Sequence, residues 1–243
     1  MDNEELKIKI IHEPTQAEPY IVLDKPAGLA SAPLKEGDDC AYTQAELLYP
    51  FIKDVCGSKT VEHGLLHRID TPTRGLLLVA STQDFYDYMH EKQKEGLFIK
   101  EYRAECIKTP VVSELEGFAP EDRRLAFRDV EEGFDVSSYF RPYGIRNCAV
   151  RPVTEQSGKA ALKKAGSEIY TTHVRIDSGN KAVCSIKKGY RHQVRCHLAW
   201  IGYPIIGDNL YNPLYKEGQK LCFEASAFSF PDMESGEFLT YSL

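Results

Sequence analysis

Arg68 and Asp70 form the charged pair of this sequence that is best placed to do chemistry. They stand two residues apart, shortly before the apolar run 76–80, so on an extended backbone both side chains point to the same side. Thr73 to Gly75 predicts a turn, and Gly75 relieves steric limits where the run begins. A charged pair held against a buried strand is unfavourable in a core and useful in an active site built on a carboxylate. The plainer interpretation is a loop that carries a surface ion pair.

Lys100 and Tyr102 are a second pair of candidates. They lie on one face of the strand that alternation predicts over 98–108. A Lys-x-Tyr pair alone also fits simple cross-strand packing, with the lysine stem lying along apolar surface.

A third set of candidates lies on the predicted helix 192–201 and at its start. Helical spacing puts two arginines on one stripe and two hydrogen-bonding side chains on another. The first stripe holds Arg191 and Arg195, and the second holds Gln193 and His197. The helix N-terminus beside Gly189 could attract a phosphate group. The alternative is a surface helix with a basic face.

A metal site is not expected. His63 and His67 are four residues apart, a spacing that can place two ligands on one helix face, but Gly64 lies between them and no acidic third ligand is obvious. The seven cysteines are odd in number and include no Cys-x-x-Cys pair, which argues against a disulfide framework or a zinc ribbon. We expect them to be reduced and mostly packed.

Four motifs, in their order along the chain, closely resemble those of the RluA-type pseudouridine synthases. They are Tyr20-Ile21-Val22-Leu23-Asp24-Lys25-Pro26-Ala27-Gly28-Leu29; His67-Arg68-Ile69-Asp70 with Thr73 and Gly75-Leu76-Leu77-Leu78-Val79-Ala80; Lys100-Glu101-Tyr102; and Gly189-Tyr190-Arg191-His192-Gln193-Val194-Arg195-Cys196-His197-Leu198 followed by Gly202-Tyr203-Pro204-Ile205-Ile206-Gly207-Asp208. The second and fourth motifs are specific, and the four together span residues 20 to 211.

The resemblance implies an α+β fold in which residues 1–243 form a single catalytic domain, with a mixed, mostly antiparallel central sheet flanked by helices. It implies that the protein isomerises uridine to pseudouridine in a structured ribosomal or transfer RNA, with no cofactor and no metal. Asp70 would be the essential carboxylate, with Arg195 as its ionic partner, and Tyr102 would stack on the uracil. The sequence leaves open whether Asp70 attacks the sugar or removes a proton from it.

The substrate-binding residues implied by the same resemblance surround those three. Arg68 would fill the space left by the flipped base or steady that base. The complete set is Arg68, Arg74, Lys100, Arg191, Gln193 and His197. Lys25 in the first motif would be mainly structural.

The sequence departs from the family pattern beside Asp70. Arg74 stands where the family usually has serine, and Pro72 stands where an acidic residue is common. Arg74 could contact an RNA phosphate or be a surface substitution. No N-terminal S4-like RNA-binding module is expected in residues 1–243, so target recognition would come from the catalytic domain, helped by a loop-rich insert over 110–165.

The composition is ordinary for a soluble globular protein of 243 residues, with 42% hydrophobic and 27% charged residues. No apolar run reaches the length of a membrane span, and the N-terminus lacks the features of a secretory signal, so a cytoplasmic location is expected. The sequence leaves the oligomeric state open, and a monomer is the default expectation. The net charge of −6 disfavours non-specific nucleic-acid binding. RNA would therefore have to meet local clusters, of which one is Lys187, Lys188, Arg191 and Arg195 and the other is Arg68 and Arg74.

The elements that must position these residues are mostly strands. Strands are expected over 19–25, 76–80, 98–108, 168–177, 181–188, 221–230 and 236–242, and helices over 42–53, 83–95 and 192–201. The helix 42–53 should bury Ala45, Leu47, Leu48, Phe51 and Ile52. Residues 177–180 should form a hairpin turn, and Thr82 should cap the helix that follows it.

Two other functions compete with the synthase. One is a non-catalytic RNA-binding protein on the same fold, for which Pro72 and Arg74 beside Asp70 are the best support. The other is a metal-dependent hydrolase, whose ligands would be His63, His67, Asp70 and His197. The loose spacing of these four residues argues against it.

Overall fold

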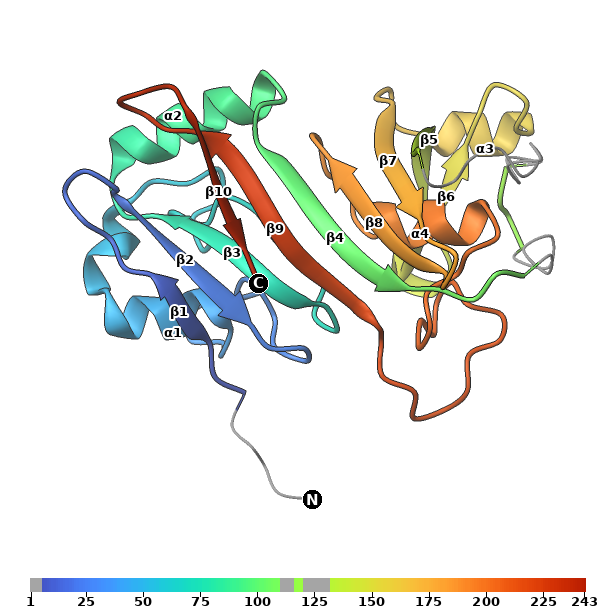
Figure 1. Cartoon of the computed structure of the whole chain (residues 1–243), viewed down its shortest axis with the longest axis horizontal. Coiled ribbons are helices and arrows are strands. Elements are labelled where there is room, and N and C mark those ends of the chain that lie inside the picture. Colours follow the sequence, from blue (N-terminus) through green and yellow to red (C-terminus); the bar gives the residue numbers. More distant parts are fainter. Residues whose placement is uncertain (1–5, 110–115, 120–131) are drawn as a thin grey trace. The chain divides into compact units, whose positions relative to one another are not determined.

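The computed structural model describes residues 6–109, 116–119 and 132–243, and the chain folds as two compact units (Figure 1). The first unit contains Met1–Lys100 and Glu224–Leu243, and the second contains Glu101–Phe223. Parts of the predicted insert, 110–115 and 120–131, lie outside the described residues. The prediction that residues 1–243 make one catalytic domain stays a prediction.

The first unit is built on a mixed sheet. Its strands are β1 (Lys9–His12), β2 (Tyr20–Lys25), β3 (Arg74–Ala80), β9 (Phe223–Pro231) and β10 (Phe238–Ser242). They follow the order β1-β2-β3-β9, with β10 paired to β9. The β3–β9 pair is parallel, and the other pairs of this unit are antiparallel.

The core of the first unit forms where apolar strands meet one helix. All six residues of β2 are buried, as in a strand covered on both faces. Helix α2 (Gln83–Lys94) starts at Thr82, whose hydroxyl accepts a hydrogen bond from the backbone of Phe85, and ends before Gly96 in the left-handed region. Its buried face, with Phe85 and Met89, packs against the aromatic side chains of β9. The predicted cap and helix are confirmed.

The prediction for residues 42–53 is wrong in part. Helix α1 (Ala41–Leu48) ends before Pro50, which has no N–H and starts a 3₁₀ turn, η1 (Pro50–Asp54). The change of period breaks the single apolar stripe. Ala45 and Ile52 are buried, whereas Leu47, Leu48 and Phe51 are exposed by 82%, 59% and 48%.

The second unit is built on five strands in the order β4-β8-β7-β5-β6. They are β4 (Ile99–Glu105), β5 (Phe134–Tyr143), β6 (Ala149–Val153), β7 (Tyr170–Ile176) and β8 (Lys181–Ile186). The pairs β5–β6, β5–β7 and β7–β8 are antiparallel. Helices α3 (Lys159–Lys164) and α4 (Gln193–Trp200) and the turn η3 (Ile145–Asn147) complete it. The described part of 110–165 thus contains regular strands.

The predicted turn over 177–180 is confirmed. The Asp177 carboxylate accepts hydrogen bonds from the backbone N–H groups of Gly179 and Lys181, and Asn180 adopts a left-handed conformation with φ of 61°. This local chemistry fixes the register of the β7–β8 hairpin.

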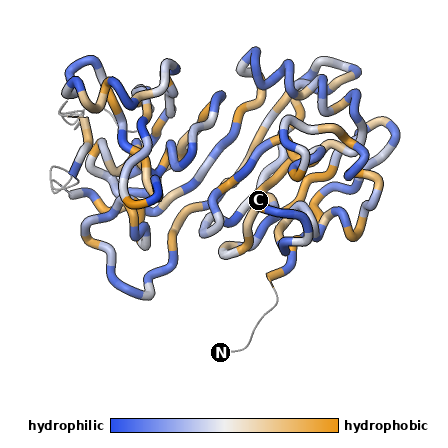
Figure 2. Tube along the Cα trace, turned by 180° about the vertical axis from the view of Figure 1, so that it is seen from behind, coloured by the Kyte–Doolittle hydropathy of each residue, from blue (hydrophilic) through white to orange (hydrophobic). Residues whose placement is uncertain are grey.

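The α+β fold with a mixed, mostly antiparallel sheet is confirmed. In Figure 2 apolar stretches follow the strands of each unit, and the connecting loops are mostly hydrophilic. Among the described residues, the helices are all too short or too polar to cross a membrane.

Candidate active site

The backbone around Asp70 is fixed by hydrogen bonds within the first unit. Ser31 donates from its hydroxyl to the carbonyl of Ile69 at 2.7 Å and accepts from the Ile69 N–H at 3.1 Å. The Thr73 N–H donates to the Asp70 carbonyl at 2.9 Å and closes a turn over residues 70–73. The turn predicted over Thr73 to Gly75 is therefore wrong in position, because β3 already begins at Arg74. The half-buried Asp70 carboxyl group is therefore presented from a rigid loop.

Lys25, at the end of β2, anchors that loop. Its side chain is fully buried, and its ammonium donates to the carbonyls of Leu29 at 2.6 Å, Pro26 at 3.0 Å and Thr71 at 3.2 Å. Burial lowers the pKa of Lys25 to about 8, while the negative charges of Asp70 and, less strongly, Asp24 oppose this shift. The ammonium thus connects the chain after β2 to the residue after Asp70 and supplies positive charge near the carboxylate.

The sequence indicated only a structural role for Lys25 and did not reveal that its ammonium supplies positive charge near the Asp70 carboxylate. A lysine that ends a run of otherwise apolar strand residues, directly before Pro26, could have signalled it. Such a side chain must either leave the strand for solvent or find buried acceptors, and here it finds three.

The side chain of Arg68 lies in solvent. It is 55% exposed, and its Nη1 is 2.9 Å from the Glu62 carboxylate. Asp70 is more deeply placed than Arg68, although the two are separated by one residue only. The plainer interpretation, a surface ion pair of Arg68 with Asp70, is therefore wrong about the partner, because the carboxylate that Arg68 contacts is that of Glu62.

Arg74 makes ion pairs with two carboxylates of its own unit. Its Nη2 is 2.8 Å from Oδ2 of Asp24, its Nε contacts both Asp24 oxygens at 3.3 Å, and its Nη1 is 3.6 Å from Oε2 of Glu224. These contacts join β2, β3 and β9 at the level of Gly75. The hydrogen bond to Asp24 is the main reason that the pKa of Arg74 is raised.

Two basic side chains of the first unit have strongly lowered pKa values, the half-buried His67 and the buried Lys100. His67 accepts a hydrogen bond at Nε2 from the Leu78 N–H at 3.1 Å, and burial, with the charge of Lys100, lowers its pKa to about 3. Burial likewise lowers the pKa of Lys100 to about 8, and its ammonium lies 4.7 Å from the ring centre of Phe98. His67 is therefore neutral and holds β3, which gives it a structural role.

Tyr102 shares a buried face of β4 with Lys100, as the alternation predicts. Within the second unit its ring stacks on Phe223, with ring centres 5.2 Å apart and planes 12° apart. Stacking on one face fixes the plane of the phenol ring.

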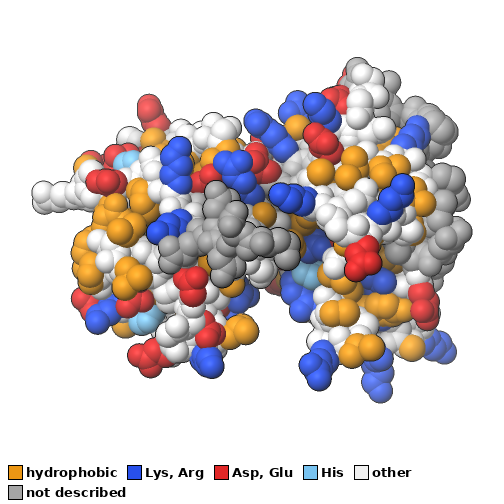
Figure 3. Space-filling model, turned by 90° about the horizontal axis from the view of Figure 1, so that it is seen from below, with side chains coloured by type: hydrophobic (Ala, Val, Ile, Leu, Met, Phe, Trp, Pro, Cys, Tyr) orange, Lys and Arg blue, Asp and Glu red, His pale blue; other side chains and the backbone are white. Residues whose placement is uncertain are grey.

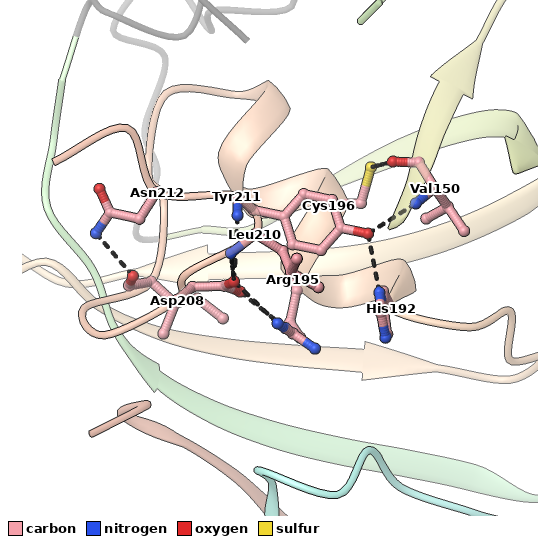
Figure 4. Close-up of polar contacts among 9 residues, drawn as sticks. Val150, His192, Arg195, Cys196, Asp208, Leu210, Tyr211 and Asn212 are labelled. Atoms are coloured by element: carbon pink, nitrogen blue, oxygen red, sulfur yellow. Dashed lines mark hydrogen bonds and ion pairs between the residues drawn. The ribbon is translucent and has the colours of Figure 1, made fainter. Parts of the chain in front are cut away.

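The interpretation of α4 as a surface helix is wrong, because all eight of its residues are buried. The physical reason is that each polar side chain of the helix has a partner inside the second unit. Arg195 binds Asp208 through two short contacts, Nε to Oδ2 at 2.8 Å and Nη2 to Oδ1 at 2.9 Å (Figure 4). Oδ1 also accepts from the backbone of Leu210 and Tyr211, so the carboxylate is fully used and the guanidinium has one fixed orientation.

A hydrogen-bond network around Tyr211 supports this pair (Figure 4). The Tyr211 hydroxyl accepts from the Val150 N–H at 2.9 Å and lies 3.0 Å from Nδ1 of His192. Its ring centre is 5.4 Å from the Arg195 guanidinium. The start of α4, the strand β6 and the Asp208 loop are thereby held together.

Gln193 and His197, expected to bind substrate, have their polar atoms engaged within the second unit. Gln193 donates to Thr171 and Thr172 and accepts from Tyr190. The two ring nitrogens of His197 lie 2.8 Å from the hydroxyl of Thr172 and 3.0 Å from that of Ser138, and burial lowers the pKa of His197 to about 3. Both side chains fasten α4 to the sheet, a role that the motif did not reveal.

Arg191, by contrast, is exposed at the start of α4. It donates to the carbonyl of Asn147 and, at 3.1 Å, to that of Ala149. Because carbonyls carry no net charge, the positive charge of Arg191 is not neutralised by these contacts.

The residues considered as metal ligands have other contacts. His63 stacks on Tyr42, and the rings of His67 and His197 hydrogen-bond as described above. In the part of the chain that the structure describes, no three His, Cys, Asp or Glu side chains are grouped so as to hold a metal ion.

Comparisons with known proteins show which proteins this chain resembles. The chain is 24% identical over 213 residues to ribosomal large subunit pseudouridine synthase D of Pseudomonas aeruginosa, covering 88% of this chain and 56% of that protein. It is 28% identical over 213 residues to the protein of the same name from Yersinia pestis, covering 86% of this chain and 54% of that one. The chain thus spans about half the length of these relatives.

The fold also has a solved counterpart. The human RNA Pseudouridylate Synthase Domain Containing 1 protein superimposes with a TM-score of 0.64 at 16% identity, covering 98% of this chain and 83% of the human one. The family profile described as RNA pseudouridylate synthase matches residues 19–200, which include Lys25, Asp70, Tyr102 and Arg195. The chain therefore belongs to the RNA pseudouridylate synthase family.

Proposed function

We propose that this protein isomerises uridine to pseudouridine in RNA. In this reaction the bond between N1 of uracil and C1′ of the ribose breaks, the base turns, and C5 bonds to C1′. The C5 proton is lost and N1 gains one, so no redox change occurs. As the family resemblance implies, we propose that neither a cofactor nor a metal ion takes part.

Asp70 is the reacting carboxylate in this proposal, either attacking C1′ or removing the C2′ proton. The observation that carries it is the fixed loop in the first unit: Ser31 and Thr73 hold the backbone on both sides of Asp70, and the buried Lys25 ammonium lies near its carboxylate. A nearby cation keeps a carboxylate ionised, as both routes require.

Tyr102 and Arg195 have the roles that the family resemblance implies. The stacking of Tyr102 on Phe223 supports a ring whose orientation is set before a base arrives. Arg195 contacts Asp208 through Nε and Nη2, and these two contacts hold its guanidinium in one orientation. A fixed orientation supports the proposed role of Arg195 as the ionic partner of the Asp70 carboxylate. Both roles require each side chain to stay in place when RNA binds.

The substrate class is a structured RNA, and we propose large-subunit ribosomal RNA because two relatives carry that substrate in their names. Transfer RNA is the alternative. Acidic and basic side chains are mixed on the face drawn in Figure 3, as a net charge of −6 leads one to expect. RNA would then be held by local groups such as the exposed Arg68, Arg146, Lys187 and Arg191, with Lys100 nearer the reacting base. We propose that the protein works as a monomer in the cytoplasm.

The test is tritium release from RNA that carries [5-³H]uridine, using large-subunit ribosomal RNA and bulk transfer RNA in parallel. Wild type should release tritium, and Asp70→Asn should release none while RNA affinity and thermal melting are retained. Asp84→Asn, a change at an exposed carboxylate of α2, is the matched control and should behave as wild type. Turnover by Asp70→Asn would remove Asp70 from the reaction. RNA binding by wild type without turnover on any RNA would favour the non-catalytic alternative.

A further inference from the structure

The hairpin formed by β5 and β6 is strongly basic, although the net charge of the chain is −6. Residues 136–154, which make up most of this hairpin, contain three arginines and no aspartate or glutamate. A fourth arginine, Arg191, donates hydrogen bonds to the carbonyls of Asn147 and Ala149 beside the hairpin tip. Positive charge is therefore concentrated on one element of an otherwise acidic protein.

The charges of these arginines are not neutralised by their contacts. Arg141 donates to the Gly117 carbonyl at 3.0 Å, and its guanidinium lies 5.1 Å from the ring centre of Tyr143. Arg151, only 6% exposed, donates to the Glu116 carbonyl at 2.8 Å and lies 4.1 Å from the centre of the same ring. Carbonyls and rings carry no net charge, and within the described residues none of the four arginines is paired with a carboxylate. Their field is therefore available to an external anion.

The backbone at the tip of the hairpin is fixed. In the turn η3, Arg146 and Asn147 are both left-handed, with φ of 53° and 57°. The Asn147 N–H donates to the Gly144 carbonyl and the Cys148 N–H to the Ile145 carbonyl, each at 3.1 Å. A left-handed conformation is unfavourable for residues other than glycine, so it persists here because these contacts hold it. The tip thus presents its side chains from a defined backbone.

Ile145 points into solvent at this tip. It is 86% exposed, more than any other large hydrophobic side chain in the described part of the second unit. A single exposed hydrophobic residue is common on protein surfaces. Ile145, however, directly precedes the exposed Arg146, on a hairpin whose cations lack counter-ions. An apolar side chain next to such cations fits a ligand that has both anionic groups and apolar faces, as the phosphates and bases of a nucleic-acid strand do.

From these observations we propose that the tip of the β5–β6 hairpin binds the RNA at nucleotides other than the reacting uridine. Ile145 packs on the face of an unpaired base, and Arg146 and Arg191 bind phosphates beside it. The proposal rests on the proposed function, because it takes RNA as the substrate. It adds that the RNA is single-stranded where it meets the tip, since base faces are hidden in a stacked, paired helix. Arg191 directly precedes α4, so RNA bound there would be held to the start of the helix that carries Arg195.

A protein is the other class of partner that an exposed isoleucine suits. The centre of a protein–protein interface is apolar and depleted of charged residues. The tip instead offers a single exposed isoleucine with two guanidinium groups, those of Arg146 and Arg191, close to it. This composition favours RNA.

Cys148 provides a direct test, because it is an exposed thiol next to the η3 turn. Wild-type protein is treated with iodoacetamide alone, with an in vitro transcript of large-subunit ribosomal RNA, and with bulk transfer RNA. The alkylated peptide is then quantified by mass spectrometry. RNA should slow the alkylation of Cys148 in proportion to the fraction of protein that is bound. An unchanged rate when the protein is fully bound to either RNA would overturn the proposal.

Substitution of Ile145 tests the contact with a base. Ile145→Ser should raise the Kd for RNA about fivefold without changing its salt dependence, because only apolar contact is lost. Ile145→Phe should bind at least as tightly as wild type, because an aromatic ring stacks well on a base. Ile169→Ser changes an isoleucine of the same unit that is 57% exposed, and this matched control should bind as wild type does. Equal Kd values for Ile145→Ser and Ile169→Ser would overturn the proposal.

Substitution of Arg146 tests the contact with phosphate. In Arg146→Ala the slope of log Kd against log salt concentration should fall by about one, the change expected for one lost phosphate contact. Arg146→Lys, which keeps the charge, should keep the slope. Arg175→Ala removes an exposed arginine of β7 and is the control. A slope that is the same in Arg146→Ala and wild type would also overturn the proposal.

The side chains of Ile145 and Arg146 are exposed, so these variants should melt as wild type does. The alkylation test needs no substitution and therefore decides the proposal even if a variant fails to fold. Protection of Cys148 in a protein that releases no tritium would refute the proposed function and leave the tip contact standing. Tritium release with an unprotected Cys148 would retain the proposed function and remove the tip contact.

Discussion

Arg195 and Asp208 form a buried, bidentate ion pair inside the second unit, with side-chain exposures of 2% and 0%. Two charges this deeply buried are stable only as a pair, because each would otherwise lack both water and a counter-ion. The pair joins the middle of α4 to the loop that ends at Asp208. The two parts of the fourth motif, Gly189–Leu198 and Gly202–Asp208, are therefore held together by this contact.

Asp208→Asn should lower the free energy of unfolding by about 3–5 kcal/mol, because it leaves a buried guanidinium without its counter-ion. The double variant Arg195→Met with Asp208→Leu should be less destabilised than Asp208→Asn, since no charge is stranded. Urea unfolding at pH 7 measures both. Glu95→Gln, which breaks the surface Lys92–Glu95 pair, is the control and should change stability far less than Asp208→Asn. Equal effects at the buried and exposed pairs would contradict the structure.

Gly75→Ala should destabilise the protein strongly. Gly75 has φ of +137°, and an added Cβ would lie 2.3 Å from the carbonyl oxygen of Ala225 and 2.7 Å from its nitrogen. Strand β3 would have to separate from β9 where the two are paired. Gly236→Ala has a positive φ of +74° and open space around the Cβ, so it isolates the backbone strain, about 1 kcal/mol. Melting temperatures should fall much further for Gly75→Ala, and equal shifts would mean that the close approach of β3 and β9 is not real.

Lys100→Met should stabilise the protein at neutral pH, because it removes a buried ammonium whose pKa burial lowers to about 8 from an ordinary value of 10.5. The unfolded chain keeps its proton up to about pH 10.5, whereas the folded chain releases it near pH 8, so wild type regains stability as the pH rises between these values. The advantage of Lys100→Met should therefore be largest below pH 8 and shrink between pH 8 and 10.5. Urea unfolding of both proteins across this range measures it, and a constant difference would refute the burial of the ammonium.

His67 and His197 should not titrate between pH 5 and 8. Burial lowers the pKa of each to about 3, while an unfolded histidine titrates near 6.5. Below about pH 6.5 the unfolded chain binds protons that the folded chain does not, so these two groups make stability fall as the pH drops toward 3. Ring resonances in ¹H–¹⁵N spectra, assigned with His67→Phe and His197→Phe, should keep constant shifts from pH 5 to 8. A resonance that moves in this range would mean that its ring is open to water.

The variant Tyr102→Phe distinguishes the role of the Tyr102 ring from that of its hydroxyl group. The stack on Phe223 involves the ring alone, so this variant should keep the fold and RNA affinity. If the phenol moves a proton, kcat should fall at least about tenfold with KM little changed. Tyr102→Ala should also raise KM, because the stacking surface for a base is lost. Tritium release under single-turnover conditions measures both, and equal kcat values for Tyr102→Phe and wild type would limit the residue to stacking.

Much of the fold follows from local signals in the sequence. The apolar run of β2, the cap at Thr82 and the Asp177–Asn180 turn are each set by neighbouring residues, so periodicity and turn chemistry were sufficient to predict them. The limits of α1 were not predicted correctly. The expected helix 42–53 continued through Pro50, whereas the α-helix ends before Pro50 and a 3₁₀ turn follows.

The environment of α4 was unpredictable for a different reason. Three of its residues are strongly polar, and their burial depends on partners that are distant along the chain: Asp208 for Arg195, Thr172 for Gln193, and Ser138 for His197. The same holds for Arg74, whose partner Asp24 lies in another motif. Motif order could identify the family, whereas the hydrogen-bonding role of each side chain depends on which strands the fold brings together.

The split construction of the first unit has a consequence for biosynthesis. The second unit is one continuous stretch, Glu101–Phe223, whereas the first needs β9 and β10 from the last residues of the chain. During translation the second unit would emerge from the ribosome before β9 does. In that interval β3, a hydrophobic strand, would lack its β9 neighbour and have unpaired backbone N–H and C=O groups along that edge. The nascent chain is thus most prone to aggregate in the interval between the emergence of the second unit and the emergence of β9 and β10.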